Sequence, residues 1–326
     1  MRIELQKLTS IAKFLAIKHS IKTQTVLALE KPSRILLQNI YHSWLKTIHG
    51  KTVQHFPVYL DKDVAIKSQK LCYGFIKPQS ADIDEIILHN DEFKPKNNVE
   101  LKLNLVVPTQ DAMQYFIQWQ RYRKYWWSSI TTTPSLFSIN DMKQENESAD
   151  VNIIANFNWG PLVVETISIT SNGSEHNNTT ETSSLTCAMG LETALLTLLL
   201  DGISNTTKEE YLKLHNKMAP YKISFGLDSE GMDKDEKVLS TLKELSQVIF
   251  HKLRAKEISS WLPTFTLPLQ LQIKENLHMG VTYTAILNEN TLSNGIFHLL
   301  NSNTMLKEQV HVADFDTYAA ILCGKR

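Results

Sequence analysis

The residues with the clearest potential for chemistry lie in one short segment, 121–127, whose sequence is RYRKYWW. Arg121, Arg123 and Lys124 could neutralise phosphates, and the aromatic rings beside them could stack on bases or anchor a protein partner. On a helix these side chains spread around the axis, so only some of them share a face. The alternative is structural, with both tryptophans in the core and the cations in solvent. We favour the core for the tryptophans, and phosphate contact by the three cations stays open.

Motifs of the common catalytic sites are absent from the sequence. There is no P-loop, GxGxxG, HExxH or GxSxG pattern. The 11 histidines are scattered and none has a partner at metal-ligand spacing. We interpret His251, His278 and His298 as surface or satisfied core residues. No catalytic residue is predicted.

Acidic and sulfur ligands do not gather either. Asp82, Asp84 and Glu85 form a small acidic cluster, which we interpret as a solvated face rather than a metal site. The cysteines are odd in number and far apart, at Cys72, Cys187 and Cys323. Their spacing indicates neither a disulfide framework nor a zinc site. We therefore expect no metal and no cofactor.

The bulk composition is that of a globular protein with no global electrostatic bias. The 326 residues include 34 Lys or Arg and 34 Asp or Glu, so nucleic-acid binding would need a local patch. No apolar run reaches the roughly 18 residues of a membrane span. The first 40 residues contain seven basic residues against Glu4 and Glu30. This composition is typical of a mitochondrial presequence, assigned here to residues 1–30, or else of an ordinary basic helix.

The first part of the chain, up to about residue 210, is predicted to contain mainly strands and a few helices. Alternating apolar residues predict a half-buried strand at 100–107, and Asp111 stands where the next helix needs an N-cap. Further strands are predicted at 54–60, 71–76, 151–157 and 162–168, and helices at 34–45 and 190–201. Gly202 is a natural C-cap for the second of these helices. The polar stretches 141–150 and 171–184 have too few apolar residues for a core, and we interpret 171–184 as a surface loop or insert.

The second part alternates strand and helix more regularly. The predicted order is strand 221–227, helix 235–256, strand 258–262, helix 268–277, strands 281–287 and 296–300, and helix 313–322. The pair Asn294-Gly295 predicts a turn between the last two strands. Crossover connections imply a parallel or mixed sheet with helices packed on it. The polar segment 202–208 is the predicted linker, and it divides the chain into residues 1–210 and 211–326.

Three segments carry a resemblance to known proteins: residues 119–141, WQRYRKYWWSSITTTPSLFSIND; residues 157–165, FNWGPLVVE; and the tail with LKLHNKMAPY at 212–221 and NENTLSNGIFHLLNSNTMLKE at 288–308. The chain resembles class II aminoacyl-tRNA synthetases of the glycyl, prolyl and histidyl group. More narrowly, it is similar to the accessory (processivity) subunits of mitochondrial DNA polymerase, in their short insect-type form. The similarity is readily followed from about residue 119 to 322 and is weak before that.

The resemblance implies an α+β fold. A degenerate class II synthetase-like domain with an antiparallel sheet is expected in residues 1–210. An anticodon-binding-like α/β domain with a mixed five-stranded sheet is expected in residues 211–326. It also implies a non-catalytic protein of the mitochondrial matrix and nucleoid. Such a protein binds the catalytic subunit of the polymerase and enhances processivity and primer-template DNA binding during mitochondrial DNA replication.

One departure from the synthetase pattern bears on catalysis. Synthetases hold ATP with arginines, one of which lies in a GxxR segment that opens an apolar helix. The matching segment here is GLET at 190–193, and Thr193 replaces the arginine without its charge or its two-pronged geometry. The rival interpretations are a working glycyl- or prolyl-type synthetase and a tRNA- or RNA-binding module.

The resemblance also names candidate contacts. Arg121, Arg123 and Lys124 are the candidates for double-stranded or primer-template DNA. The candidates for the catalytic subunit are apolar or turn residues of the second domain, with core packing as the alternative: Trp261, Leu262, Phe265, Gly295 and His298. Vertebrate members dimerise through a helical insertion, and the segment 54–107 contains no long helical hairpin. We therefore expect no homodimer, and no membrane partner.

Overall fold

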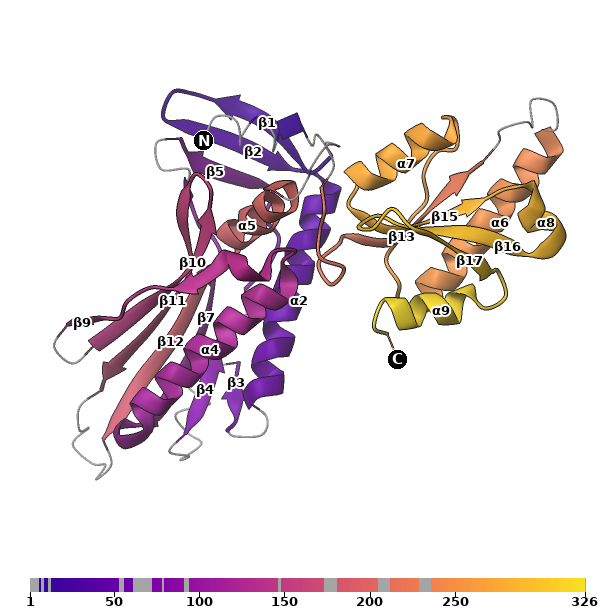
Figure 1. Ribbon diagram of the computed structural model, residues 1–326. Coiled ribbons are helices and arrows are strands. Elements are labelled where there is room, and N and C mark those ends of the chain that lie inside the picture. Colours follow the sequence, from indigo (N-terminus) through magenta and orange to yellow (C-terminus); the bar gives the residue numbers. More distant parts are fainter. Residues whose placement is uncertain are drawn as a thin grey trace.

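The protein is seen here in a computed structural model that describes residues 6, 9–10, 13–52, 56–60, 72–77, 79–90, 94–145, 148–172, 181–204, 212–228 and 236–325. These residues form an α+β fold, as predicted, with three sheets. Figure 1 shows two bodies: an N-terminal one from indigo to red and a C-terminal one from orange to yellow. In the described ranges no helix has the length and apolar character needed to cross a membrane.

The largest sheet of the N-terminal body has eight strands and is almost entirely antiparallel. Its strands lie in the order β3 (Val58–Tyr59), β4 (Tyr73–Ile76), β7 (Glu100–Pro108), β12 (Thr182–Gly190), β11 (Gly160–Ser171), β10 (Ser148–Phe157) and β8 (Phe137–Ile139), with β9 (Lys143–Glu145) paired to β10. Only β3 and β4 run parallel. In β7 the alternating leucines face the core, so the strand predicted at 100–107 is confirmed.

Three long helices cover one side of this body. They are α2 (Lys31–Thr52), α4 (Ala112–Ile130) and α5 (Leu191–Ser204). Figure 1 shows α4 lying across β7, β12 and β11, with α2 beside it. Asp111 stands at the N-cap of α4, as predicted, although its side chain makes no capping hydrogen bond. The short 3-10 helices η1 (Thr109–Asp111) and η2 (Pro134–Leu136) flank α4.

A smaller sheet joins β1 (Leu15–Ser20), β2 (Gln24–Leu29), β5 (Glu85–His89) and β6 (Lys94–Pro95). Residues 1–5, 7–8 and 11–12 lie outside the described part of the chain. Phe14, Leu15, Leu27 and Leu29 are all buried in the core of the N-terminal body. A removable presequence that reached residue 30 would take two paired strands out of this sheet. Basic composition alone does not distinguish a presequence from a structured hairpin, and the presequence at residues 1–30 stays a prediction.

Strands extend into the ends of both polar stretches, and most of the loop predicted at 171–184 lies outside the described residues. Residues 143–145 form β9, and β10 begins at Ser148. Ser171 ends β11 and β12 begins at Thr182, while residues 173–180 lie outside the described residues. These strands can be polar at one end because one face of the sheet carries Ser, Thr and Asn side chains that hydrogen-bond across strands, such as Thr186 to Asn104.

The C-terminal body is built on a mixed five-stranded sheet, as predicted. The strand order is β14 (Ser260–Trp261), β13 (Tyr221–Leu227), β15 (Val281–Leu287), β16 (Ile296–Asn301) and β17 (Lys307–His311). The first three are parallel and the last two antiparallel to their neighbours. Helices α6 (Glu236–Ala255) and α9 (Phe315–Leu322) cover one face, and α7 (Leu269–His278) covers the other (Figure 1).

The predicted turn at Asn294-Gly295 is instead the end of a short helix, α8 (Glu289–Asn294). Asn288 and Thr291 form a reciprocal capping box at its start. Gly295 adopts a left-handed conformation with φ of 72° and caps its end. Both a hairpin and a helix C-cap need a residue with positive φ, so the dipeptide alone did not separate the two.

The segment between the bodies packs on the first of them. Leu212, Leu214, Met218 and Ala219 belong to the N-terminal core. Lys222 Nζ donates to the carbonyl oxygens of Asn216 and Ala219, and burial lowers the pKa of this lysine to about 8. In packing terms the N-terminal body extends to Ala219, beyond the predicted division at residue 210. Across the junction, Lys13 pairs with Glu275 at 3.3 Å.

Gly202 is not a C-cap, since α5 continues through it to Ser204. A Cβ atom at this position would lie 2.7 Å from both the Lys213 carbonyl oxygen and Leu212 Cδ1. Lys213 N donates to the Gly202 carbonyl at 3.1 Å. The glycine therefore allows residues 212–213 to pack closely against α5, and it does not end the helix.

Replacing Gly202 with alanine should accordingly destabilise the fold, by about 1–3 kcal/mol, because backbone rather than a flexible side chain must move. Gly50→Ala is the matched control, since Gly50 lies in α2 with no atom within 4 Å of the added Cβ. It should raise the free energy of unfolding by up to about 1 kcal/mol. Urea denaturation measures both, and an equal effect of the two substitutions would contradict the packing role.

Candidate partner and nucleic-acid interface

Helix α4 carries the basic-aromatic segment and presents two different faces. Its buried side chains follow helical spacing: Ala112, Phe116, Trp119, Arg123, Trp126, Trp127 and Ile130. The tryptophans are thus core residues, as favoured from the sequence. The opposite side of the helix carries Arg121, with Lys124 partly exposed beside it.

Arg123 belongs to the buried face and not to the surface. Its side chain is 1% exposed, and Nε donates to Glu165 Oε1 at 2.6 Å. The guanidinium also lies 4.4 Å from the centroid of the Trp126 ring. Because no face of the side chain reaches solvent, the expectation that Arg123 contacts DNA is wrong. Residue type indicated phosphate binding, but the helix rotation turns this cation inward.

Glu165 is the residue that makes this inward position tolerable. Its second oxygen accepts from Trp127 Nε1 at 2.7 Å, so both oxygens of the buried carboxylate are used. A shift in the pairing of β10 with β11 occurs where Ile153 faces Glu165, and it places Val164 and Glu165 both in the core. The sequence holds one signal for this role, an acidic residue inside an apolar strand.

The buried pair also affects its neighbours. Burial raises the pKa of the Cys187 thiol strongly, and the negative charge of Glu165 adds to this effect. Arg123 Nη2 lies 3.6 Å from the Met189 sulfur, whereas Nη1 has no partner among the described residues. Cys187 is therefore a core thiol whose deprotonation is disfavoured.

The solvent side of α4 forms a continuous surface. Met113, Ile117, Arg121 and Tyr125 follow one another at intervals of four residues, and Tyr125 is 72% exposed. We call these four residues the α4 stripe. Lys124 flanks it. The stripe and Lys124 thus combine two cations with an aromatic ring and apolar groups, which suits contact with a phosphate backbone or a partner surface.

The segment GLET lies where a strand passes into a helix, with Gly190 ending β12 and Leu191 opening α5. Thr193 is buried, and its backbone N and hydroxyl both donate to Asn97 Oδ1, at 3.1 and 2.9 Å. A Cβ on Gly190 would lie 2.0 Å from the Asn97 side chain. Asn97 therefore occupies the space beside this turn, and Thr193 serves local structure.

Glu192 is likewise committed to the backbone. Its carboxylate accepts from the Asn98 amide at 2.8 Å and from the Val99 amide at 3.3 Å. Burial raises the pKa of this carboxyl, and these hydrogen bonds oppose the shift. These bonds hold residues 97–99 against the start of α5, and the side chains of Glu192 and Thr193 are used within the protein.

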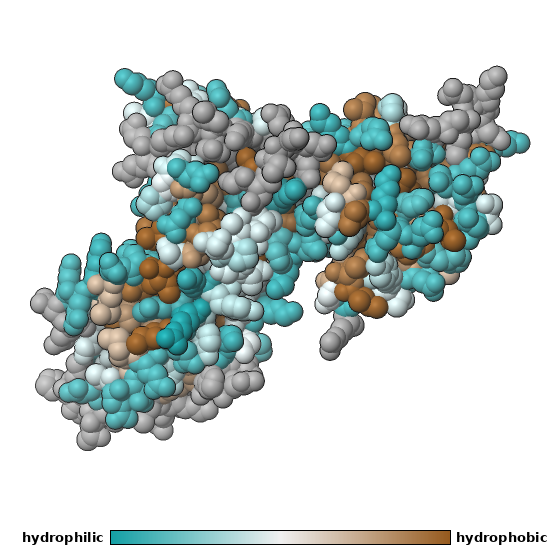
Figure 2. All heavy atoms as spheres, in the orientation of Figure 1, coloured by the Kyte–Doolittle hydropathy of each residue, from teal (hydrophilic) through white to brown (hydrophobic). Residues whose placement is uncertain are grey.

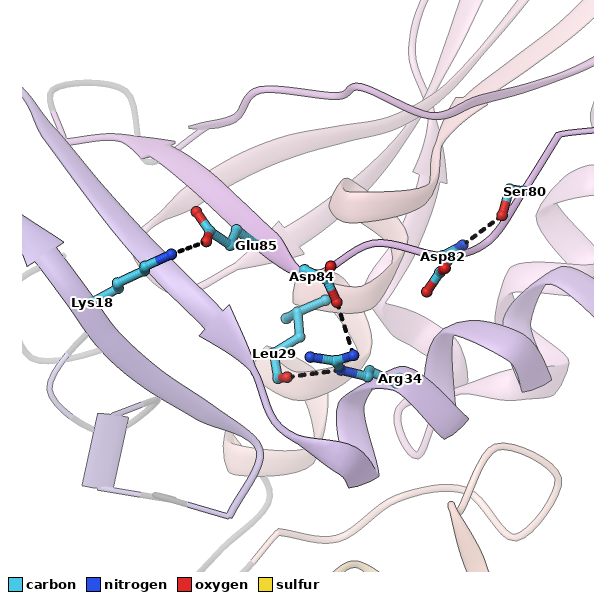
Figure 3. Close-up of polar contacts among 7 residues, drawn as sticks. All are labelled: Lys18, Leu29, Arg34, Ser80, Asp82, Asp84 and Glu85. Carbon is cyan, nitrogen blue, oxygen red and sulfur yellow. Dashed lines mark hydrogen bonds and ion pairs between the residues drawn. The ribbon is translucent and has the colours of Figure 1, made fainter.

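The acidic cluster 82–85 faces solvent and is used in ion pairs, as Figure 3 shows. Arg34 from α2 pairs with Asp84 at 2.8 Å, and Lys18 from β1 pairs with Glu85. The Asp82 amide donates to Ser80 Oγ. Within the described ranges, no three potential metal ligands gather at one place.

The five candidate contacts of the C-terminal body fall into two separate groups. Trp261 is half-buried, with its ring 5.6 Å from that of Tyr221, and Leu262 and Phe265 pack partly against the core. Gly295 and His298 lie at the start of β16 and within it. Because β14 and β16 are three strand spacings apart, about 14 Å separates the groups. The structure does not bring them together.

Comparison with known proteins gives one consistent result. No protein-family model matches the chain. The chain is 24% identical over 289 residues to DNA polymerase subunit gamma-2, mitochondrial, of Drosophila melanogaster, covering 82% of this chain and 76% of the relative. It is 24% identical over 296 residues to DNA polymerase subunit gamma-2 of Bos taurus, covering 82% and 59%. It is 26% identical over 224 residues to the mitochondrial subunit of Xenopus laevis, covering 60% and 46%.

The matched relatives are named as a subunit of a DNA polymerase. More narrowly, the chain is a homologue of the proteins named DNA polymerase subunit gamma-2. Two of the relatives are named as mitochondrial, which supports the predicted localisation. The matched region spans only about half the length of the vertebrate relatives.

The buried pair allows a direct stability test. Arg123→Met should lower the free energy of unfolding by about 3–5 kcal/mol, because it leaves the Glu165 carboxylate buried without its cation. The double variant Arg123→Met/Glu165→Gln should recover part of this loss, since the amide still accepts from Trp127. As a control, Lys102→Met breaks an exposed pair with Glu100 and should cost less than about 1 kcal/mol. Denaturant titration of all three decides, and a loss at Arg123 no larger than that at Lys102 would be the contrary result.

Proposed function

We propose that this protein is a non-catalytic accessory subunit that binds the catalytic subunit of the mitochondrial DNA polymerase and raises its processivity and its hold on primer-template DNA. The observation that carries the proposal is the match to subunit gamma-2, which covers 82% of the chain. The matched relatives are named as polymerase subunits, and the assignment of their partner to this chain is our inference.

Contact with DNA is assigned to the α4 stripe and its flank. Of the three cations predicted to contact DNA, Arg123 is buried with Glu165, whereas Arg121 and Lys124 lie on the outer side of the helix. Each could neutralise one phosphate, and Tyr125 offers an exposed ring beside them. Because the net charge is zero, DNA binding would depend on this small patch and would be weak. The protein would therefore add to the DNA contacts of a polymerase and would not substitute for them.

Contact with the catalytic subunit is assigned to the C-terminal body. Trp261, Leu262 and Phe265 form one candidate surface at the β14 edge, and Gly295 and His298 form another near the β17 edge. Added interface slows dissociation of a complex, and added phosphate contacts lengthen its stay on the template. Together these effects would lengthen each round of synthesis.

We further propose that the two bodies correspond to a degenerate class II synthetase-like domain and an anticodon-binding-like domain. The antiparallel sheet with α5 behind it, and the mixed five-stranded sheet, support this assignment. The hydrogen bonds of Thr193 to Asn97 support a protein without the ATP clamp. The rival synthetase would catalyse ATP–pyrophosphate exchange with glycine or proline, and the rival tRNA-binding module would bind tRNA without the polymerase.

The proposed function has a direct test in primer extension by the cognate catalytic subunit, with and without this protein, over a series of salt concentrations. Addition of the protein should lengthen products and extend activity to higher salt. Arg121→Ala/Lys124→Ala should weaken DNA binding of the complex and make the dependence of log affinity on log salt shallower by up to about 2. The control pair Lys252→Ala/Lys274→Ala, on α6 and α7, should leave this slope unchanged. Unaltered product length with the wild-type protein would refute the proposed function.

We also expect the protein to be monomeric in solution, joining the polymerase one to one. The part of segment 54–107 that the structure describes contains strands β3 to β7 and no helical hairpin. Light scattering should therefore return a mass near 37.3 kDa. Twice that mass would contradict the expectation.

A further inference from the structure

A pocket of about 510 Å³ opens at the junction of the two bodies, beside the outer strand β14. Aromatic side chains from three elements line it: Tyr221 of β13, Phe250 of α6 and Trp261 of β14. Lys31, the first residue of α2, and Arg254, in the last turn of α6, complete the rim. We call this the Tyr221 pocket. Of these five residues, only Trp261 was predicted to contact a partner.

The Tyr221 hydroxyl in this pocket lacks a hydrogen-bond partner in the described part of the chain. The residue is 4% exposed, and its phenolic oxygen has no hydrogen-bond partner among the described residues. Burying a hydroxyl without a partner costs free energy, so such groups normally find a bond. An acceptor supplied by a ligand in the pocket would satisfy this one.

The positive charges around the pocket also lack ion-pair partners among the described residues. Neither Lys31 nor Arg254 forms an ion pair with a described residue, and Arg254 instead lies 5.7 Å from the Phe250 ring centroid. The acid on the rim, Glu257, already pairs with Lys325 at 3.1 Å. Helix α2 has no acid in its first turn, but Glu30 directly precedes it, so the positive charge at the pocket comes from the side chains of Lys31 and Arg254. The pocket therefore favours a negatively charged occupant.

The edge of the sheet adds a backbone component. Strand β14 is the outermost strand and pairs on one side only, with β13. An extended peptide beside it could use the outer backbone groups while a side chain enters the pocket. A nucleic-acid strand fits less well, because only two cations flank the aromatic rings and an acid shares the rim.

We propose that the Tyr221 pocket binds an acidic segment of a protein partner, in which an aromatic or large aliphatic side chain is flanked by aspartate or glutamate. The apolar side chain would contact the Trp261 and Phe250 rings. A flanking carboxylate would accept from the Tyr221 hydroxyl and face Lys31 and Arg254. The assignment of this segment to the catalytic subunit rests on the proposed function, whereas the chemistry of the pocket does not.

A peptide probe tests the pocket without the polymerase. The full chain is titrated into the peptide fluorescein-Asp-Glu-Phe-Glu-Asp-amide, which carries the label at its N-terminus. The anisotropy is compared with that of the lysine counterpart, in which lysine replaces each acidic residue, and with that of a labelled single-stranded oligonucleotide. The acidic peptide should bind most tightly. Lys31→Glu and Arg254→Glu should each raise its dissociation constant about tenfold, and Lys274→Glu on α7 should leave it unchanged.

Tyr221→Phe separates binding from folding. It removes only the unpartnered hydroxyl, so the free energy of unfolding should stay the same or rise, while peptide affinity falls severalfold. A failure of the acidic peptide to bind, an equal loss with Lys274→Glu, or preference for the oligonucleotide would overturn the proposal.

A second measurement addresses the identity of the partner. Arg254→Glu should weaken binding of the catalytic subunit in a pull-down titration by the same factor as binding of the peptide. Unchanged affinity for the catalytic subunit would overturn the assignment to that partner. If the wild-type protein binds the peptide but not the catalytic subunit, the proposed function fails and the pocket chemistry stands.

Discussion

The buried ion pair between Arg123 and Glu165 is the constraint on which the outer surface of α4 depends. Two charges that are removed from water must lie in direct contact, because otherwise each would be buried without a partner. The contact between Arg123 and Glu165 forms in only one rotation of α4 about its axis. The Trp127 hydrogen bond to the same carboxylate reinforces that rotation. Once Arg123, Trp126 and Trp127 are buried, Arg121 and Tyr125 must face solvent. An interior interaction thereby decides which cations are available to DNA.

A second set of interior contacts bears on the proposed lack of an ATP clamp. An ATP site of the synthetase type needs charged groups held ready but unpaired, since their partner is the nucleotide. The GLET turn has the opposite arrangement. Both donors of Thr193 bond to Asn97, and the Glu192 carboxylate accepts from two backbone amides. Polar groups satisfied inside the protein stabilise the turn and are not available to a substrate. This is the physical basis on which we regard the fold as a scaffold for binding.

Sequence patterns predicted the elements far better than the roles of single residues. Period-two and helical spacing predicted β7, β13, β15 and α6 nearly to their ends, because burial of one face is a local property of each element. Gly202 and Gly295 were misassigned because a glycine that admits a neighbouring chain looks, in sequence, like one that ends a helix or forms a turn. Arg123 was misassigned because its partner lies 42 residues away on a strand with a pairing shift. Only tertiary contacts carry that information.

Helix α2 links the two proposed binding surfaces. Its first residue, Lys31, lies on the Tyr221 pocket, while Ser43 accepts a hydrogen bond from Trp126 of α4 and Lys51 lies over the Tyr122 ring. A polymerase bound at the pocket would therefore be held at a fixed distance from the α4 stripe. Two contacts joined in this way act at a high effective concentration, so each can be weak alone. A neutral protein with two exposed cations on one helix could thus retain a polymerase on DNA without binding DNA tightly itself, and its contribution would be largest where salt weakens the contacts of the polymerase alone.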